Sequence, residues 1–134
     1  MALARGYYNG FGGKSEEGET VLQAAVREVQ EESMVQVEEK DLQQVADVVF
    51  VYKDRTLHVP TFFVSQWEGE PMETQEMKPA WFSYDAVPYE QMWEDDRHWM
   101  PRVFNGEKLR GTVWFAQDGT SIESMEWEQV ENFI

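Results

Sequence analysis

One stretch of this chain, residues 13–35 (GKSEEGETVLQAAVREVQEESMV), constrains its fold more than any other. Thr20 and Gln23 have the spacing of a capping box, in which each side chain binds the other residue's backbone N–H. We therefore expect a helix to begin near Val21. Four apolar residues then recur at helical spacing and predict a face that packs on a sheet: Leu22, Ala25, Val26 and Val29.

Three carboxylates occupy the adjoining face of this expected helix. Glu28, Glu31 and Glu32 are related by steps of three and four residues, which brings them to one side. Their repulsion costs a few tenths of a kcal/mol per exposed pair, roughly, and a bound cation relieves it. For Glu31 and Glu32 alone, a solvated helix end is the better interpretation. The fixed positions nearby favour a metal site instead: Gly13, Glu19, Arg27 and Glu28.

This spacing resembles the Nudix box, the motif of a family that uses divalent metal to hydrolyse nucleoside diphosphates linked to another group. One position differs, because Met34 stands where the family has glycine. That glycine commonly ends the helix in a left-handed conformation, which other residues adopt at a cost of about 1–2 kcal/mol. The resemblance implies an α/β (α+β) fold, a Nudix-type α/β/α sandwich with a mixed sheet, formed by residues 1–134 as a single domain.

Three further segments, residues 9–14, 75–82 and 92–99, extend the resemblance over nearly the whole chain. They resemble the MutT-type oxidised purine nucleoside triphosphatases, which clear 8-oxo-dGTP and 2-hydroxy-dATP from the nucleotide pool. In that branch an aromatic residue stacks on the base, while an asparagine and two aspartates read its edge. Carried over by position, these roles and the neighbouring substrate contacts fall on Trp93, Asn9, Asp95 and Asp96, with Phe11, Gly12, Gly13, Lys14 and Glu94.

The chemistry of Asp95 and Asp96 can be argued from the residues themselves. Adjacent carboxyls in a partly dry pocket resist double ionisation, so one can stay protonated. The pair then offers a donor and an acceptor, and moving the proton lets it read two oxidised purines. A helix N-cap is an equally favoured interpretation of these aspartates. Core packing is the alternative for Trp93 and the preferred interpretation of Trp99. Neither histidine has a convincing catalytic partner in the sequence.

The resemblance also implies a reaction, in which water attacks a phosphorus of the triphosphate and releases the monophosphate and pyrophosphate. Glu76 would complete the metal site or act on the attacking water; a solvated glutamate in a turn is its alternative. Arg27 is expected to orient the glutamates by ion pairing, and Glu19 to play a structural part. The implied ligands for Mg²⁺, with Mn²⁺ as the alternative, are Gly12 through its carbonyl, Glu28, Glu31, Glu32 and Glu76.

The charge and the cysteine content of the chain limit the classes of partner that we expect. The formal net charge is −15, so a nucleic-acid polymer is not expected as a partner, because phosphate backbones require basic surface. A single nucleotide delivered with metal ions is compatible with this charge. No cysteine is present, which excludes disulfides and thiolate metal sites. With no signal peptide or membrane span in the sequence, we expect no membrane partner and a cytoplasmic location, with nuclear or mitochondrial pools as alternatives.

The remaining elements follow from strand and turn patterns. Residues 46–52 and 57–67 predict a strand pair, and residues 80–84 a further short strand. Residues 85–93 and 96–104 predict two short helices. Residues 109–117 and 121–129 flank an Asp-Gly turn and predict a hairpin.

The start of the chain departs from the resemblance, which implies a strand, a turn and a further strand before the glycine-rich loop. Only residues 1–8 precede that loop, so we expect the N-terminal strand or strands to be missing. A sheet without them exposes edges and apolar surface. A monomer is implied by the family. The short start leaves two alternatives open: the chain compensates by dimerising or swapping, or it is a truncated product with reduced stability and activity. Two other functions stay open: hydrolysis of another nucleotide derivative, such as a dinucleoside polyphosphate or nucleotide sugar, and a non-catalytic remnant that binds a nucleotide or a partner.

Overall fold

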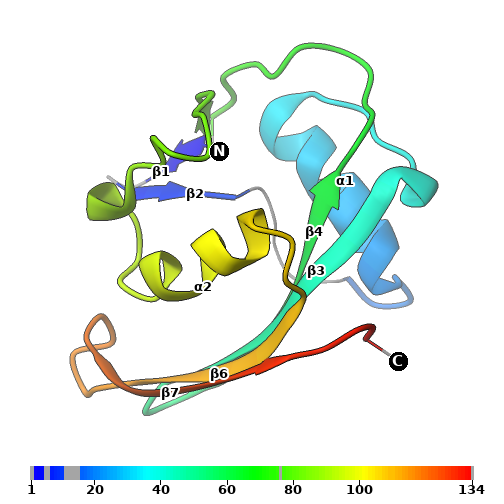
Figure 1. The fold of residues 1–134 in the computed structure, drawn as a ribbon. Coiled ribbons are helices and arrows are strands. Elements are labelled where there is room, and N and C mark those ends of the chain that lie inside the picture. Colours follow the sequence, from blue (N-terminus) through cyan, green and yellow to red (C-terminus); the bar gives the residue numbers. More distant parts are fainter. Residues whose placement is uncertain (1, 5–6, 11–15, 76, 134) are drawn as a thin grey trace. The chain divides into compact units, whose positions relative to one another are not determined.

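The computed structural model describes residues 2–4, 7–10, 16–75 and 77–133, shown in Figure 1. These residues form two compact units. One comprises Met1–Gln43 and Val64–Met92, and the other Gln44–Phe63 and Trp93–Ile134. The first contains the long helix α1 and a small sheet, and the second contains a larger mixed sheet and helix α2.

Helix α1 of the first unit spans Val21–Ser33 and begins as the sequence predicts. Gln23 donates its backbone N–H to Thr20 Oγ1 at 3.1 Å, and Thr20 donates its own to Gln23 Oε1 at 2.9 Å. The capping box is therefore confirmed. The predicted apolar face is only half-buried along most of its length, and the fully buried positions are Ala24, Glu32 and Ser33.

Met34 ends this helix in a left-handed conformation, with φ 65° and ψ 14°. Its N–H donates to the Gln30 carbonyl at 2.8 Å, so the helix closes as it would on a glycine. Beyond it, Gln36 and Glu68 form an isolated antiparallel bridge, and Met72 donates its N–H to the Ser33 carbonyl at 2.9 Å. The segment that contains Glu68 and Met72, distant in sequence, is thus fastened to the end of α1 and the residues that follow it.

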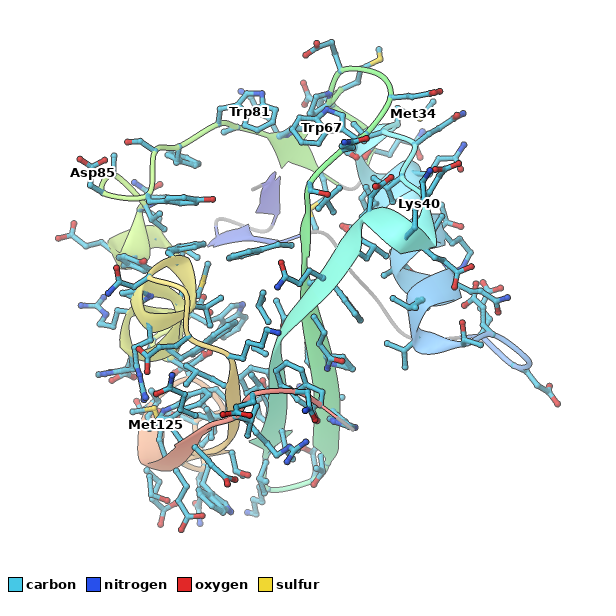
Figure 2. The ribbon with its side chains drawn as sticks, turned by 45° about the vertical axis from the view of Figure 1, so that its right-hand side comes forward. Met34, Lys40, Trp67, Trp81, Asp85 and Met125 are labelled. Carbon is cyan, nitrogen blue, oxygen red and sulfur yellow. The ribbon has the colours of Figure 1, made fainter. Side chains whose placement is uncertain are left out.

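The small sheet of the first unit has the order β2–β1–β5, with every pairing antiparallel. Its strands are β1 (Ala2–Ala4), β2 (Tyr7–Asn9) and β5 (Lys78–Pro79). The N-terminal segment therefore contains strands of its own, because β1 pairs on both sides. The expected strand at residues 80–84 is wrong. Trp81 is 71% exposed there and lies beside Trp67, with ring centroids 5.9 Å apart and the rings tilted by 31°, rather than entering a core (Figure 2).

The mixed sheet has the order β4–β3–β6–β7 and confirms the α/β expectation. Strand β3 (Leu42–Val51) follows the 3₁₀ turn η1 (Glu39–Asp41) and runs parallel to β6 (Leu109–Phe115). β6 is antiparallel to β7 (Ile122–Gln129), as the predicted hairpin requires. β4 (Thr56–Val64) follows β3 through a turn in which Tyr52 donates its N–H to the Arg55 carbonyl at 2.8 Å.

Helix α2 (Asp96–Phe104) buries Trp99 and Val103 against the residues of this sheet. The core cluster consists of Val45, Ala46, Val48, Trp99, Val103, Leu109, Val113 and Phe115. The predicted helix at residues 85–93 is wrong, since only the 3₁₀ turn η2 (Tyr89–Gln91) forms there, directly after Pro88. Within the described part of the chain, no helix is long and apolar enough to cross a membrane.

Candidate active site

The three predicted glutamates of α1 lie in different environments. Glu32 is 3% exposed at the end of the helix. The side chain of Glu28, one turn earlier, is 14% exposed, whereas that of Glu31 is 54% exposed. Two of the three carboxylates are therefore largely removed from water, which costs free energy unless a donor or a cation compensates them.

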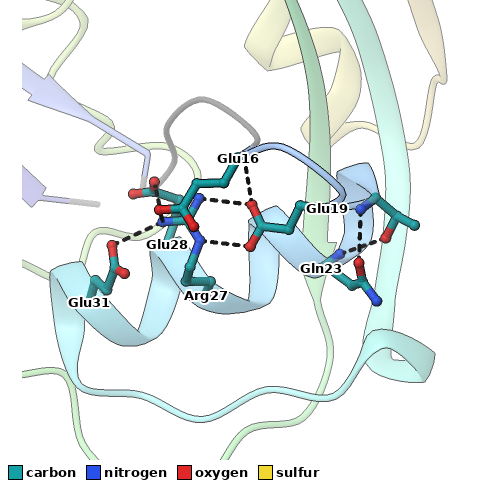
Figure 3. Close-up of polar contacts among 7 residues, drawn as sticks. Glu16, Glu19, Gln23, Arg27, Glu28 and Glu31 are labelled. Atoms are coloured by element: carbon teal, nitrogen blue, oxygen red, sulfur yellow. Dashed lines mark hydrogen bonds and ion pairs between the residues drawn. The ribbon is translucent and has the colours of Figure 1, made fainter.

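Arg27 is the donor that holds Glu28 and Glu31 together (Figure 3). Its NH1 donates to Glu28 Oε1 at 2.8 Å and to Glu31 Oε2 at 3.1 Å. Its Nε and NH2 donate to the two carboxylate oxygens of Glu19 at 2.7 and 3.0 Å. Only the planar guanidinium fork can make this paired contact and still reach two further carboxylates. The expectation that Arg27 orients the glutamates and Glu19 plays a structural part agrees with this geometry.

Electrostatics stabilise the same arrangement. The hydrogen bond from Arg27, and next the one from the Glu16 backbone N–H, hold the pKa of Glu19 below its usual value. The hydrogen bonds to Glu19, and then to Glu28 and Glu31, raise the pKa of Arg27 above its already high value. Both groups are thus charged throughout the range in which the protein would work.

A second contact at the end of α1 escaped the sequence analysis. Thr74 donates its hydroxyl to the Glu32 carbonyl at 3.1 Å and accepts the Met77 N–H on the same oxygen at 3.3 Å. These bonds fasten Thr74 and Met77 to the backbone of the last turn of α1. A lone threonine in a polar turn carries no signal by which the sequence could reveal this role.

The carboxylate oxygens of the α1 glutamates are ligands of the kind that a hard divalent cation prefers. Glu28 and Glu32 lie one helical turn apart on α1 and offer such oxygens, and Arg27 draws Glu28 and Glu31 together on the same helix. Among the described residues there is no group of three or more side chains placed to hold a metal ion. The other predicted ligands, Gly12 and Glu76, lie outside the described residues, as do Phe11, Gly13 and Lys14.

Asp95 and Asp96 form a second acidic site, in the other unit, at the start of α2. They are 2% and 6% exposed. Burial, the charge of Asp95 and a hydrogen bond between the carboxyls raise the pKa of Asp96 to about 8. Burial also raises the pKa of Asp95, although a hydrogen bond from Trp99 opposes the shift. One of these carboxyls is therefore protonated at neutral pH, so the pair presents a donor beside an acceptor.

The helix-cap interpretation of this pair does not hold for Asp95. It occupies the N-cap position, but its side chain makes no capping hydrogen bond. Its Oδ2 instead accepts from Trp99 Nε1 at 2.9 Å, while Asp96 Oδ2 is buried without a hydrogen-bond partner among the described residues. Trp99 belongs to the core, as preferred from the sequence, and its link to Asp95 is an additional finding.

The neighbours of the pair are arranged as follows. Trp93 is half-buried, and its carbonyl accepts the Asp96 N–H at 3.1 Å. The Glu94 carboxylate accepts the Ile122 N–H of β7 at 3.3 Å, so it holds this turn to the sheet. Tyr52 stacks on Phe115 with ring centroids 4.7 Å apart and borders a shallow hollow of about 340 Å³. Asn9, the other residue expected to read the base, belongs to the first unit, where it is the last residue of β2.

Both acidic sites lie in a segment of the chain that matches a known protein family. The family model described as the NUDIX domain matches residues 3–103. The chain belongs to the Nudix family. Its box includes the α1 site described above, and Met34, at the position where the family has glycine, has a left-handed backbone conformation. Use of divalent metal ions is general in this family.

Relatives and a solved structure agree with this assignment. The chain is 38% identical over 120 residues to an oxidized purine nucleoside triphosphate hydrolase from Danio rerio, covering 88% of this chain and 76% of the relative. It is 36% identical over 130 residues to the protein of that name from Mus musculus, covering 96% and 81%. A mutator MutT protein from Bacillus halodurans has a similar fold, with a TM-score of 0.80, 26% identity and coverage of 92% and 84%.

Proposed function

We propose that this Nudix hydrolase cleaves oxidised purine nucleoside triphosphates, 8-oxo-dGTP and 2-hydroxy-dATP among them, to the monophosphate and pyrophosphate. The observation that carries the proposal is the buried carboxyl pair, Asp95 and Asp96, in a chain that also carries the acidic helix face of α1. A nucleotide hydrolase that accepted any base would have no need of a buried, proton-sharing pair. The names of the two animal relatives support the same substrate class.

In this proposal α1 acts on the phosphates. A divalent metal, Mg²⁺ or Mn²⁺, held by Glu28, Glu31 and Glu32 would neutralise phosphate charge and lower the pKa of an attacking water. Arg27 keeps Glu28 and Glu31 in place through the contacts at 2.8 and 3.1 Å. Gly12 and Glu76 complete the proposed metal set.

The acidic pair acts on the base. A protonated Asp96 would donate to the purine edge while an ionised Asp95 accepts from it, and Trp93 would stack on the ring, a contact worth about 1–3 kcal/mol. Asn9 is the proposed third reader of the edge. The other proposed substrate contacts lie in the glycine-rich loop: Phe11, Gly12, Gly13 and Lys14. Glu94 is proposed to act by holding the reading turn to β7.

This division of labour requires the chain to work as one catalytic domain on a single nucleotide. We propose that it does so as a monomer, because β1 is already paired on both of its edges within the chain. A cytoplasmic nucleotide pool is the proposed setting.

The test is release of pyrophosphate from 8-oxo-dGTP, 2-hydroxy-dATP and dGTP in the presence of Mg²⁺, with Glu32→Gln as the control. Circular dichroism of both proteins establishes that they are folded. The proposal predicts turnover of the oxidised nucleotides by the native chain and its loss in the variant. Folded native protein that hydrolyses none of the three nucleotides would refute it.

A further inference from the structure

The hydrogen bond from Trp99 makes the two carboxyls of the acidic pair unequal. Trp99 Nε1 donates to Asp95 Oδ2 at 2.9 Å, from one helical turn further along α2. Both side chains are buried, so water does not replace the indole as the donor. Asp96 Oδ2 is buried as well but has no hydrogen-bond partner in the described part of the chain. Asp95 thus has a hydrogen-bond donor within the protein, whereas Asp96 has an oxygen that could form a hydrogen bond with a ligand.

The indole ring of Trp99 is held in place by the core. It stacks on Trp127 with centroids 6.0 Å apart and an angle of 29° between the rings. Trp127 lies directly opposite Gly111 in the register of β6 and β7, and a Cβ at Gly111 would come within 2.2 Å of Trp127 Cε3. Because the tryptophan fills the space of a missing side chain, the stack leaves Trp99 little freedom to turn its N–H away from Asp95.

The chemistry of the two substrate bases shows why this asymmetry matters. The edge of 8-oxoguanine carries an acceptor oxygen on C6 and N–H donors at N1 and at the 2-amino group. The edge of 2-hydroxyadenine, in its keto form, carries the donors at the 6-amino group and N1 and the acceptor oxygen on C2. The order of donors and acceptors is therefore reversed between the two bases. A carboxyl pair with one fixed donor and one fixed acceptor therefore forms better hydrogen bonds with the edge of one base than with that of the other.

We propose that Trp99 is a positioning residue that fixes Asp95 as the acceptor of the pair, leaves Asp96 as the donor, and thereby sets the enzyme's preference between these two purine edges. The identity of the two substrates in this inference rests on the function proposed above. Trp99 itself touches neither base nor phosphate in this account. The raised pKa of Asp96, caused by burial and by the charge of Asp95, agrees with Asp96 as the protonated member. The charge of His98 on α2 also acts on Asp95 and lowers its pKa. The charge of Asp95 in turn helps to raise the pKa of Tyr52, the residue directly after β3, although burial of that phenol is the larger cause.

The test compares Trp99→Phe with a matched control, Trp127→Phe. Both variants remove an indole N–H and keep an aromatic ring in the same stack. The Nε1 of Trp127 makes no hydrogen bond among the described residues, whereas that of Trp99 makes the bond to Asp95. Values of kcat/KM are measured for 8-oxo-dGTP and 2-hydroxy-dATP over pH 5–9.5. We expect Trp99→Phe to change the ratio of the two values by about tenfold and to shift its pH dependence, with Trp127→Phe close to native.

Two kinetic results would overturn the proposal. One is a substrate ratio and pH profile that Trp99→Phe leaves unchanged. The other is an equal change in both variants, since loss of packing would then explain it without the N–H. The carboxyls themselves provide a readout that does not depend on turnover. In protein labelled with ¹³C at the aspartate carboxyl, the titrations of Asp95 and Asp96 are assigned with Asp95→Asn and Asp96→Asn.

We expect the titration of Asp95 to move upward in Trp99→Phe and to stay in place in Trp127→Phe. An unchanged titration in Trp99→Phe contradicts the positioning role even if the native chain hydrolyses both nucleotides. Conversely, the expected titration shift together with an absence of any turnover would sink the proposed function and leave the role of Trp99 standing.

Discussion

Arg27 and Glu19 are joined by two parallel hydrogen bonds, Nε to Oε2 at 2.7 Å and NH2 to Oε1 at 3.0 Å. This pair spans the turn before α1 and the middle of the helix, and it leaves NH1 of the same guanidinium to hold Glu28 and Glu31. The spacing between Glu19, Arg27, Glu28 and Glu31 thus has a structural reason in this chain. Glu19 anchors the arginine, and the arginine anchors the glutamates proposed to act on the phosphates.

Glu19→Gln should lower kcat without abolishing binding, because the arginine loses its anchor and the glutamates lose their orientation. Supporting residues of this kind typically contribute a factor on the order of 10–100 in activity or metal affinity. Steady-state kinetics at several Mg²⁺ concentrations measures the effect. Arg27→Lys should give a similar loss, since an ammonium cannot form the paired contact. Native kinetics in both variants would show that the glutamates are held in place by other groups.

Met34→Gly should stabilise the protein. Met34 has a left-handed φ of 65°, which costs a residue with a Cβ about 1–2 kcal/mol. Glycine removes this strain, but its greater conformational entropy in the unfolded chain offsets part of the stabilisation. Its side chain is 55% exposed, so little buried surface is lost (Figure 2). We expect a net gain of about 0.5–1 kcal/mol in urea unfolding. Met34→Ala keeps the left-handed strain and should give no gain; equal stabilisation by alanine would contradict the explanation.

Gly111→Ala should destabilise the mixed sheet, because the new Cβ would lie 2.2 Å from Trp127 Cε3 and 2.6 Å from the Glu126 carbonyl oxygen. Overpacking of this kind costs about 1–3 kcal/mol. Thermal unfolding followed by the near-ultraviolet signal of the tryptophans measures the loss. A variant as stable as the native chain would mean that the strands β6 and β7 move apart at no cost.

The stability of the protein should fall between about pH 4 and pH 8. The pKa of Asp96 is raised to about 8 in the folded protein from an ordinary value of 3.8. Between these values the folded state holds a proton that the unfolded state has released. The contribution of Asp96 to the free energy of unfolding is therefore fully present below the pKa of the unfolded state, and it is lost as the pH rises through the pKa of the folded state. Asp96→Asn removes this titration. Urea unfolding at pH 5 and pH 8 should therefore show a loss on the order of a few kcal/mol in the native chain and a smaller one in the variant. Equal slopes would contradict a protonated Asp96.

Much of the first unit could be predicted because its signals are local. The capping box of Thr20 and Gln23, the spacing of Glu28, Glu31 and Glu32, and the departure at Met34 are all carried by neighbours in sequence. The strand expected at residues 80–84 failed because an aromatic run favours a strand only where it is buried, and Trp81 is exposed. The helix expected at residues 85–93 failed because Pro88 interrupts it and leaves one 3₁₀ turn.

The acidic pair shows the limit of the same approach. The sequence left a helix cap and a base reader equally favoured for Asp95 and Asp96. The choice depends on where Trp99 points its N–H and on how deeply both carboxyls are buried, and neither is encoded in the spacing of residues. The contact of Thr74 with the end of α1 joins residues 42 positions apart and is likewise a product of tertiary packing.

The central claim is that the acidic pair and the acidic helix face act on the same nucleotide. Steady-state kinetics of Asp95→Asn and Glu32→Gln with 8-oxo-dGTP and Mg²⁺ tests it most directly. We expect Asp95→Asn to raise KM by about 10- to 100-fold through loss of the acceptor for the base, and Glu32→Gln to lower kcat by about 100-fold or more with a far smaller change in KM. Hydrolysis of 8-oxo-dGTP with native kinetic constants in either variant would contradict the claim.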